Sequence, residues 1–355
     1  ISAEDEKTSP YYGVPYTSIG KKHANEVGFF IQDEWNVTPK LTVVPGIRLD
    51  SHSSGEEYST SVKVSDSAFP STKFSKTTIN PRIAVKYEVT PSLILRANIG
   101  TGFRAPYGFS EDLHLCSGSP RVWKSSNLKG ERAISYNLSA DYYSKQYQFS
   151  INLFRTNLKD KIQFSPADDE VKKFGYSYQW ENVDDAYVQG VELGAKASIA
   201  RNLTAGVNWT FNQGKFKHER AEWSDPNDES VKEFPQRLKY AKESRYISRF
   251  PGMTGDFDID YTPGTGTFSL TGSLQGSMYI DYNSEDAGQN SKIKKTSTFM
   301  LFNCRASKRF GMCTIYAGAK NIFSYIQDEK HTDDAAFMYA PVYGATWYVG
   351  LSVKL

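Results

Sequence analysis

The sequence predicts an all-β protein, a transmembrane up-and-down antiparallel β-barrel, and three observations carry this prediction. Apolar and polar side chains alternate with a period of two along many segments of about ten residues. Between these segments, short turns alternate with long polar connections. Phe, Tyr and Trp together make up 14% of the 355 residues, and aromatic side chains favour strands.

The alternation is clear in segments 79–87 and 203–212. In the first, Ile79, Ile83 and Val85 fall on one face of an extended chain, while Asn80 and Arg82 fall on the other. Strands of a soluble β-sandwich also alternate, but they are usually only about five or six residues long. Segments of this greater length favour a wall with lipid on one side and water on the other.

The connections between the segments differ sharply in length. Tight turns are predicted at 38–40, 90–92, 144–146, 201–202 and 262–264. Long polar connections are predicted at 51–75, 104–131, 213–244, 282–296 and 323–344. Outer-membrane barrels have short turns at the periplasmic rim and long loops at the external rim, and the pattern therefore indicates that location.

The alternation predicts about thirteen strands. They run near 25–36, 41–50, 77–88, 93–103, 132–143, 147–164, 177–199, 203–212, 246–261, 267–281, 297–308, 313–322 and 345–355. An odd number of strands cannot close an up-and-down barrel whose termini are both periplasmic, and hydrocarbon cannot satisfy an open strand edge. We therefore expect preceding strands to come from a separate polypeptide, a cleaved product or a part of the protein outside this sequence.

Charge and hydropathy exclude two other classes of protein. The chain has 42 basic and 40 acidic side chains, and it has no basic block, so we expect no nucleic-acid partner. No segment approaches the ~18 consecutive apolar residues that a membrane-spanning helix needs.

Three cysteines are too few for a disulfide framework. Cys304 and Cys313 flank a predicted tight turn, and they could face each other across a hairpin. The alternative is that they are two small residues without a bridge, and the sequence leaves both interpretations open.

Several phrases of the sequence resemble the barrel of TonB-dependent receptors. They are Gly-Phe-Phe-Ile-Gln-Asp-Glu-Trp at 28–35, Asn-Pro-Arg at 80–82, Gly-Phe-Arg-Ala-Pro at 102–106, Asn182-Val183 with Gly190-Val191-Glu192, and Lys-Asn-Ile-Phe at 320–323. The resemblance covers the chain from about residue 25 to residue 355, in the order and spacing of the family.

This resemblance implies a barrel of about twenty-two strands that closes around an amino-terminal plug domain. Residues 1–355 would form the carboxy-terminal part of that barrel, with the plug and the first strands outside this sequence. The implied partners are the TonB complex, which acts through the plug, the plug and remaining barrel strands themselves, outer-membrane lipid and a surface lipoprotein.

Arg104 is the first candidate binding residue. By the alternation in 93–103, its side chain points into the lumen, where a guanidinium could hold a carboxylate or phosphate of a ligand. The alternative is an ion pair with an acid of the plug or of the barrel wall.

The same connection resembles haem receptors of this class. Those receptors carry a Phe-Arg-Ala-Pro box, here at 103–106, then a His that can ligate iron, here His114, and then an Asn-Pro-Asp-Leu box, of which only Asn127-Leu128 is present. An imidazole suits iron and Cys116 is a softer neighbour, although a loop His can equally make an ordinary polar contact. The expected ligand-binding residues are Arg104, Tyr107, Phe109, His114, Cys116 and Arg121, with His114 as the haem-iron ligand.

We expect an outer-membrane receptor that imports an iron complex such as haem, energised by TonB. Haem or cobalamin would be cargo and not a resident cofactor. The alternatives are a cobalamin receptor, an oligosaccharide importer or a passive porin. An enzyme is not expected, because Ser110, Asp112 and His114 crowd one loop segment and no Gly-x-Ser-x-Gly turn is present.

Overall fold

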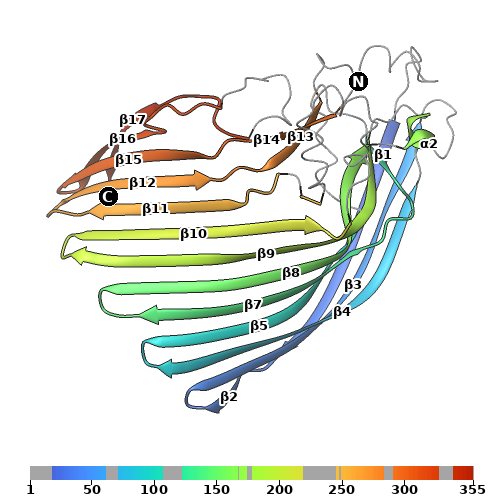
Figure 1. The fold of residues 1–355 in the computed structure, drawn as a ribbon, viewed down its shortest axis with the longest axis horizontal. Helices are drawn as coiled ribbons and strands as arrows, with labels where there is room; N and C mark the ends of the chain where they lie inside the picture. Colours follow the sequence, from blue (N-terminus) through green and yellow to red (C-terminus); the bar gives the residue numbers. More distant parts are fainter. Residues whose placement is uncertain are drawn as a thin grey trace.

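A computed structural model describes residues 18–60, 71–106, 122–166, 168–173, 178–218, 245–247, 249–283, 291–327 and 339–354, and the structural statements below concern these residues. Most of them form one long, strongly curved and almost entirely antiparallel sheet (Figure 1). Its strands are β1 (Ser18–Gln32), β2 (Trp35–Thr38), β3 (Leu41–Thr60), β4 (Thr72–Thr90), β5 (Leu93–Arg104), β6 (Val122–Lys124), β7 (Glu131–Tyr143), β8 (Tyr147–Pro166), β9 (Tyr178–Ala200), β10 (Leu203–Phe216), β11 (Met253–Tyr261), β12 (Gly266–Gln275), β15 (Phe299–Phe310), β16 (Cys313–Lys320) and β17 (Thr346–Val353).

The strands follow one another around the curve in chain order. The main path contains thirteen strands, β1-β3-β4-β5-β7-β8-β9-β10-β11-β12-β15-β16-β17, while β2 pairs with β3 and β6 pairs with β9. This arrangement confirms the predicted up-and-down topology. The strands β1 and β17 stand at the two ends of the path, so the described sheet is a curved part of a barrel wall.

Several predicted boundaries were wrong. The predicted loop 51–75 is largely strand, because β3 continues to Thr60 and β4 starts at Thr72, with Glu56 opposite Thr72. The predicted strand 267–281 is interrupted after Gln275, and β13 (Tyr279–Asn283) pairs with β14 (Ser291–Lys295) in a separate two-stranded sheet. Sequence alternation detects only those parts of a strand that have one apolar face. Beyond the membrane, the backbone hydrogen bonds between strands form without an apolar face, and alternation misses these parts.

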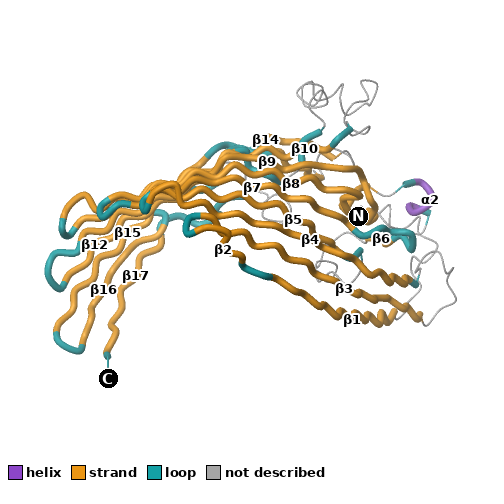
Figure 2. Tube along the Cα trace, turned by 90° about the horizontal axis from the view of Figure 1, so that it is seen from below, coloured by secondary structure: helices purple, strands orange, loops and turns teal. Residues whose placement is uncertain are grey.

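The strand ends that flank the short turns and those that flank the long connections lie at opposite rims, as predicted. The turns joining β2 to β3, β4 to β5, β7 to β8, β9 to β10, β11 to β12 and β15 to β16 all lie at one end of the strands (Figure 1). Gly264 and Gly311 in two of these turns have φ of 59° and 60°, a conformation that only glycine adopts without strain. Figure 2 shows β6 and α2 (Asp169–Lys172) at the opposite end.

The convex face of the sheet is apolar over the middle of the strands. Phe29 is 71% exposed there, which in water would cost free energy and in lipid would not. We call this surface the apolar belt. It includes Ile83, Leu95, Ile99, Tyr136, Leu138, Ile151, Leu153, Leu193, Val207, Ile259, Ile315, Val349 and Leu351.

The concave face is polar. Asn137 donates to Asn98 at 3.0 Å, and Arg96 forms an ion pair with Asp141. Each partner stands on the strand next to the other, so the wall satisfies its own polar groups facing the lumen.

No helix within the described parts of the chain is long and apolar enough to cross a membrane.

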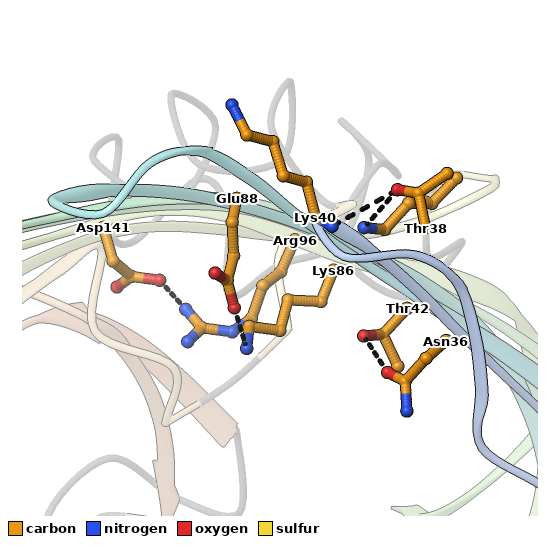
Figure 3. A network of polar contacts seen from close by, with 9 residues as sticks. Asn36, Thr38, Lys40, Thr42, Lys86, Glu88, Arg96 and Asp141 are labelled. Carbon is orange, nitrogen blue, oxygen red and sulfur yellow. Dashed lines mark hydrogen bonds and ion pairs between the residues drawn. The ribbon is translucent and has the colours of Figure 1, made fainter.

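Polar side chains form a network of contacts at the short-turn rim (Figure 3). The Thr38 hydroxyl accepts hydrogen bonds from the amides of Lys40 and Leu41, at 3.2 and 3.0 Å. Thr90 accepts from Ser92 and Leu93 at the same two distances, because both turns contain Thr-Pro. In each turn the threonine hydroxyl therefore provides an acceptor for two backbone amides.

Replacing Thr90 with valine should lower the unfolding free energy by about 1 kcal/mol, because two amides lose an acceptor but remain accessible to water. Urea unfolding of the membrane-reconstituted barrel measures the change. Thr204→Val is the matched control, since the Thr204 hydroxyl makes no hydrogen bond to any described residue. Equal losses in the two variants would contradict the role of Thr90.

The two cysteines of the last strands do not face each other. Cys304 stands opposite Ala319 and Cys313 stands opposite Phe310, and both thiols are free. The turn follows Phe310, so Cys304 lies six residues before it, about 20 Å along the strand. A disulfide needs Cα atoms within about 7 Å, and the hairpin-bridge interpretation was therefore wrong.

Candidate functional site

Arg104, the last residue of β5, lies at the long-loop end of the wall. Its Nη1 is 3.3 Å from Oε2 of Glu131, the first residue of β7. The Arg104 side chain is 42% exposed, whereas that of Glu131 is 9% exposed. Arg104 thus forms an ion pair with an acid of the barrel wall, which was the alternative predicted for it. Part of its surface remains exposed and could contact a ligand.

Glu131 also holds the backbone of the neighbouring strand. Its Oε1 accepts a hydrogen bond of 2.6 Å from the amide of Ile162. The register of β8 against β9 shifts between Leu158 and Lys161, beyond the apolar belt, and Asp160 there has a φ of 54°. Burial lowers the pKa of Lys161, with Glu131 acting against this shift and Arg104 adding to it. Arg104, Glu131 and Lys161 therefore form a compact group of charges at the long-loop end of the wall, which we call the mouth of the barrel.

Asn182 of β9 fastens this irregular region. Its Nδ2 donates to the carbonyls of Lys129 and Asp160, at 3.0 and 2.8 Å, and its Oδ1 accepts from the Lys129 amide at 2.8 Å. One side chain therefore joins the end of the β5–β7 connection to the irregular segment of β8. Asn182 belongs to a phrase quoted above for the resemblance, but sequence reasoning did not assign it this role.

A second anchor lies where the β5–β7 connection returns to the wall. There β6 pairs in parallel with β9, and the Lys124 Nζ donates to Oε1 of Glu56 at 2.7 Å. Lys22 Nζ lies 3.6 Å from the same oxygen. The Glu56 side chain is 1% exposed and that of Lys124 is 7% exposed, so the pair is almost completely removed from water. Sequence reasoning missed it, because both residues are ordinary loop charges in the sequence.

Burial lowers the pKa of Lys124 from 10.5 to about 8, although its hydrogen bond to Glu56 acts in the opposite direction. Between these two values the unfolded chain binds more protons than the folded one, so the unfolding free energy should rise with pH across this window. The rise is about 3 kcal/mol at most, at 1.36 kcal/mol for each pKa unit.

Thermal unfolding of the wild type and of Lys124→Met between pH 7.5 and 10.5 would measure this linkage. The difference in stability between the two proteins should change in favour of the wild type as pH rises. A constant difference across the window would contradict the lowered pKa.

A third contact closes the end of β10. The backbone amide of His218 donates to Asp184 Oδ2 at 2.7 Å, and the His218 Nδ1 lies 3.0 Å from Oδ1. Burial alone raises the pKa of Asp184, but the hydrogen bonds from His218 outweigh burial and lower it. Asp184 therefore stays ionised and caps the strand end.

The other predicted site residues lie outside the described residues. They are Tyr107, Phe109, His114, Cys116 and Arg121. Among the described residues, no group of three or more His, Cys, Asp or Glu side chains is placed to hold a metal ion. What the structure provides is the frame of this connection, since Arg104 begins it and β6, Asn182 and Glu131 fix its return.

The curved wall, its two unlike rims and the anchored connection agree with the comparison with known families. A family model described as TonB dependent receptor-like, beta-barrel matches residues 3–322. The chain belongs to this family. A TonB-dependent receptor barrel lies in the outer membrane, and the apolar belt is the surface that meets its lipid.

Two curated relatives illustrate the range of this receptor family. The ferric enterobactin receptor of Pseudomonas aeruginosa is 26% identical over 202 residues, which cover 52% of this chain and 24% of that protein. The vitamin B12 transporter BtuB of Photobacterium profundum is 33% identical over 116 residues, covering 32% of this chain and 17% of that protein.

Solved TonB-dependent receptors share the fold. The unliganded ferric citrate transporter FecA superimposes with a TM-score of 0.68 at 18% identity, covering 96% of this chain and 46% of that one. The copper transporter OprC gives 0.66 at 17% identity, covering 93% and 48%. This receptor barrel thus spans about half the length of those solved chains.

Proposed function

We propose that the receptor to which this barrel belongs imports an iron complex across the outer membrane, energised by TonB through a plug domain outside this sequence. The observation that carries the proposal is the mouth of the concave face, where the partly exposed Arg104 stands over Glu131 and beside Lys161. Relatives named as ferric enterobactin receptors support iron as the cargo.

In this proposal residues 1–355 are the carboxy-terminal part of the barrel, and preceding strands close the wall between β17 and β1. The plug occupies the polar concave face, and a surface lipoprotein is a further partner of the external loops. The chain carries out no covalent chemistry, which agrees with a family of transport receptors.

Arg104 would attract the negatively charged groups of an iron complex, because a guanidinium presents several donors in a fixed plane. Binding at the lumen wall and external loops would include the segment 104–116, and β6 and Asn182 hold the return of this connection to the wall. Release would follow when TonB rearranges the plug. Within iron complexes, haem is the finer hypothesis, with His114 as the axial ligand of its iron.

The test is a titration of the complete, detergent-purified receptor with haemin, with ferric enterobactin and with cyanocobalamin, followed by absorbance and calorimetry. Haemin binding with a shifted Soret band, lost in His114→Ala, would support haem. Binding of ferric enterobactin alone would keep an iron complex as cargo and make His114 an ordinary loop residue.

The double variant Arg104→Ala with His114→Ala should weaken uptake of the bound complex by about tenfold or more while the barrel still assembles, because a charge-assisted contact and an iron ligand are both lost. Uptake by whole cells, with receptor abundance in the outer membrane as the control, measures this. Unchanged uptake would contradict the site and leave the fold unaffected.

Cobalamin is the second candidate, because the vitamin B12 transporter of Photobacterium profundum is 33% identical over its matched segment. Binding of cyanocobalamin with no response to either iron complex would replace iron with this vitamin as the cargo.

A further inference from the structure

A group of basic side chains lies on the convex face of the wall, directly beyond the apolar belt. Along β8 the outward positions run through Ile151 and Leu153 and then reach Arg155 and Lys159. Register places Tyr136 opposite Arg155 and Arg132 opposite Lys159, so β7 changes from apolar to basic at the same height. We call Arg132, Arg155, Lys159 and Lys217 the basic wall patch.

The patch lines a hollow of about 600 Å³. The exposed apolar residues Ile79 and Ile134, which adjoin the apolar belt, also line it, and Arg245 adds a further cation. Asp185 is the only acid among the described residues that line it, and Asp185 Oδ2 is 3.9 Å from Lys217 Nζ. The hollow therefore carries a clear excess of positive charge where hydrocarbon gives way to polar surroundings.

Arg132 and Lys159 stand directly opposite each other on neighbouring strands. Like charges in this position destabilise a sheet, and neither side chain has an ion pair with an acid among the described residues. An anion bound between them would remove this repulsion. The arrangement is therefore suited to binding an anion between the two side chains.

Arg155 is already oriented for such a ligand. Its Nε donates to Asn157 Oδ1 at 2.9 Å, its Nη1 donates to Gln189 Oε1 at 2.8 Å, and its guanidinium lies 4.5 Å from the centre of the Tyr187 ring. A guanidinium held in place by neutral partners keeps its full charge and loses little conformational entropy when it binds phosphate.

We propose that the basic wall patch binds the phosphorylated headgroup of a lipid in the outer leaflet, with the acyl chains of this lipid lying on the apolar belt. The position favours a lipid over a soluble anion, because the patch residues of β7 and β8 share the outward register of the apolar belt, and apolar side chains next to that belt also line the hollow. This site lies on the opposite face of the wall from the import path. It would fix the depth and orientation of the barrel in the membrane.

The test uses the complete receptor in detergent, titrated with lipid A, a glycolipid that carries two phosphates, with phosphatidylcholine and with inorganic pyrophosphate. Lipid A should raise the unfolding temperature of the wild type, whereas the other two should not. In Arg132→Gln with Lys159→Gln, the apparent affinity for lipid A should fall about tenfold or more.

The matched control is Lys145→Gln with Arg201→Gln, which removes one lysine and one arginine from the short-turn rim and should bind lipid A as the wild type does. Without lipid, the patch variant should be at least as stable as the wild type, since a repulsion is removed. Full lipid A binding by the patch variant would overturn the proposal. Equal stabilisation of the wild type by pyrophosphate would overturn the lipid as the occupant.

Discussion

Replacing Lys124 with methionine should release β6 from the wall and weaken ligand binding, with a loss of about 3 kcal/mol in the free energy that holds this segment. The reason is that Glu56 would keep a charge in a place that is almost inaccessible to water. Lys22, 3.6 Å from the same oxygen, compensates only in part. Breaking a buried ion pair costs far more than breaking an exposed one.

Hydrogen exchange of the β6 amides measures this loss, because a change of 3 kcal/mol corresponds to about a hundredfold faster opening. Two variants make the result specific. Lys124→Met together with Glu56→Gln should recover most of the protection, because no buried charge remains. Lys172→Met, which removes an exposed lysine bonded to Asp169, should change nothing. If the double variant were as unprotected as Lys124→Met, the ion pair would not be the anchor.

Replacing Asn182 with alanine is the second change with a large expected effect. The variant would leave the carbonyls of Lys129 and Asp160 and the amide of Lys129 without their partner, and we expect a loss of about 3 kcal/mol at this point of the wall. The irregular segment of β8 and the end of the β5–β7 connection should then separate, and ligand affinity should fall with them.

Limited proteolysis at the β5–β7 connection and urea unfolding would measure these effects. Asn137→Ala is the matched control, since Asn137 makes one exposed hydrogen bond to Asn98 and should cost less than about 1 kcal/mol. Asn182→Asp keeps the acceptor for the Lys129 amide and loses both donor bonds, so its loss should be intermediate. Similar behaviour of the alanine variants at 182 and 137 would contradict the role of Asn182.

The mouth of the barrel shows why sequence reasoning found some residues and missed others. Arg104 was predicted to face the lumen because the alternation of β5 continues without interruption to its last residue. Glu131 was missed as its neighbour because it was placed at the end of the predicted loop 104–131, whereas it begins β7. Lys161 was missed because the irregular segment between Leu158 and Lys161 changes which face the next residues occupy. A bulge of this kind has no reliable sequence signal.

For the connection between β5 and β7, the sequence indicated a role in binding but not the contacts that hold it. Its composition suggested a binding segment, but nothing in the sequence indicated that Lys124 would meet Glu56, 68 residues earlier in the chain. That contact depends on the curvature of the whole sheet, which brings the returning β6 close to β3. Register likewise decided the placement of the cysteines, because the turn directly follows Phe310 and pairs Cys313 with Phe310, which leaves Cys304 six residues further along the strand.

The sequence by itself determined the class of fold, the number of wall strands, the two unlike rims and the lipid-facing residues. Each of these follows from local rules, since a strand with one face in lipid and one in water must alternate, and tight turns favour Pro, Gly, Asn and Ser. Only the tertiary structure decided the partner of Arg104, the buried Glu56–Lys124 pair and the basic wall patch. These depend on register and curvature, which are set by the sum of many pairings along the sheet and not by any one segment.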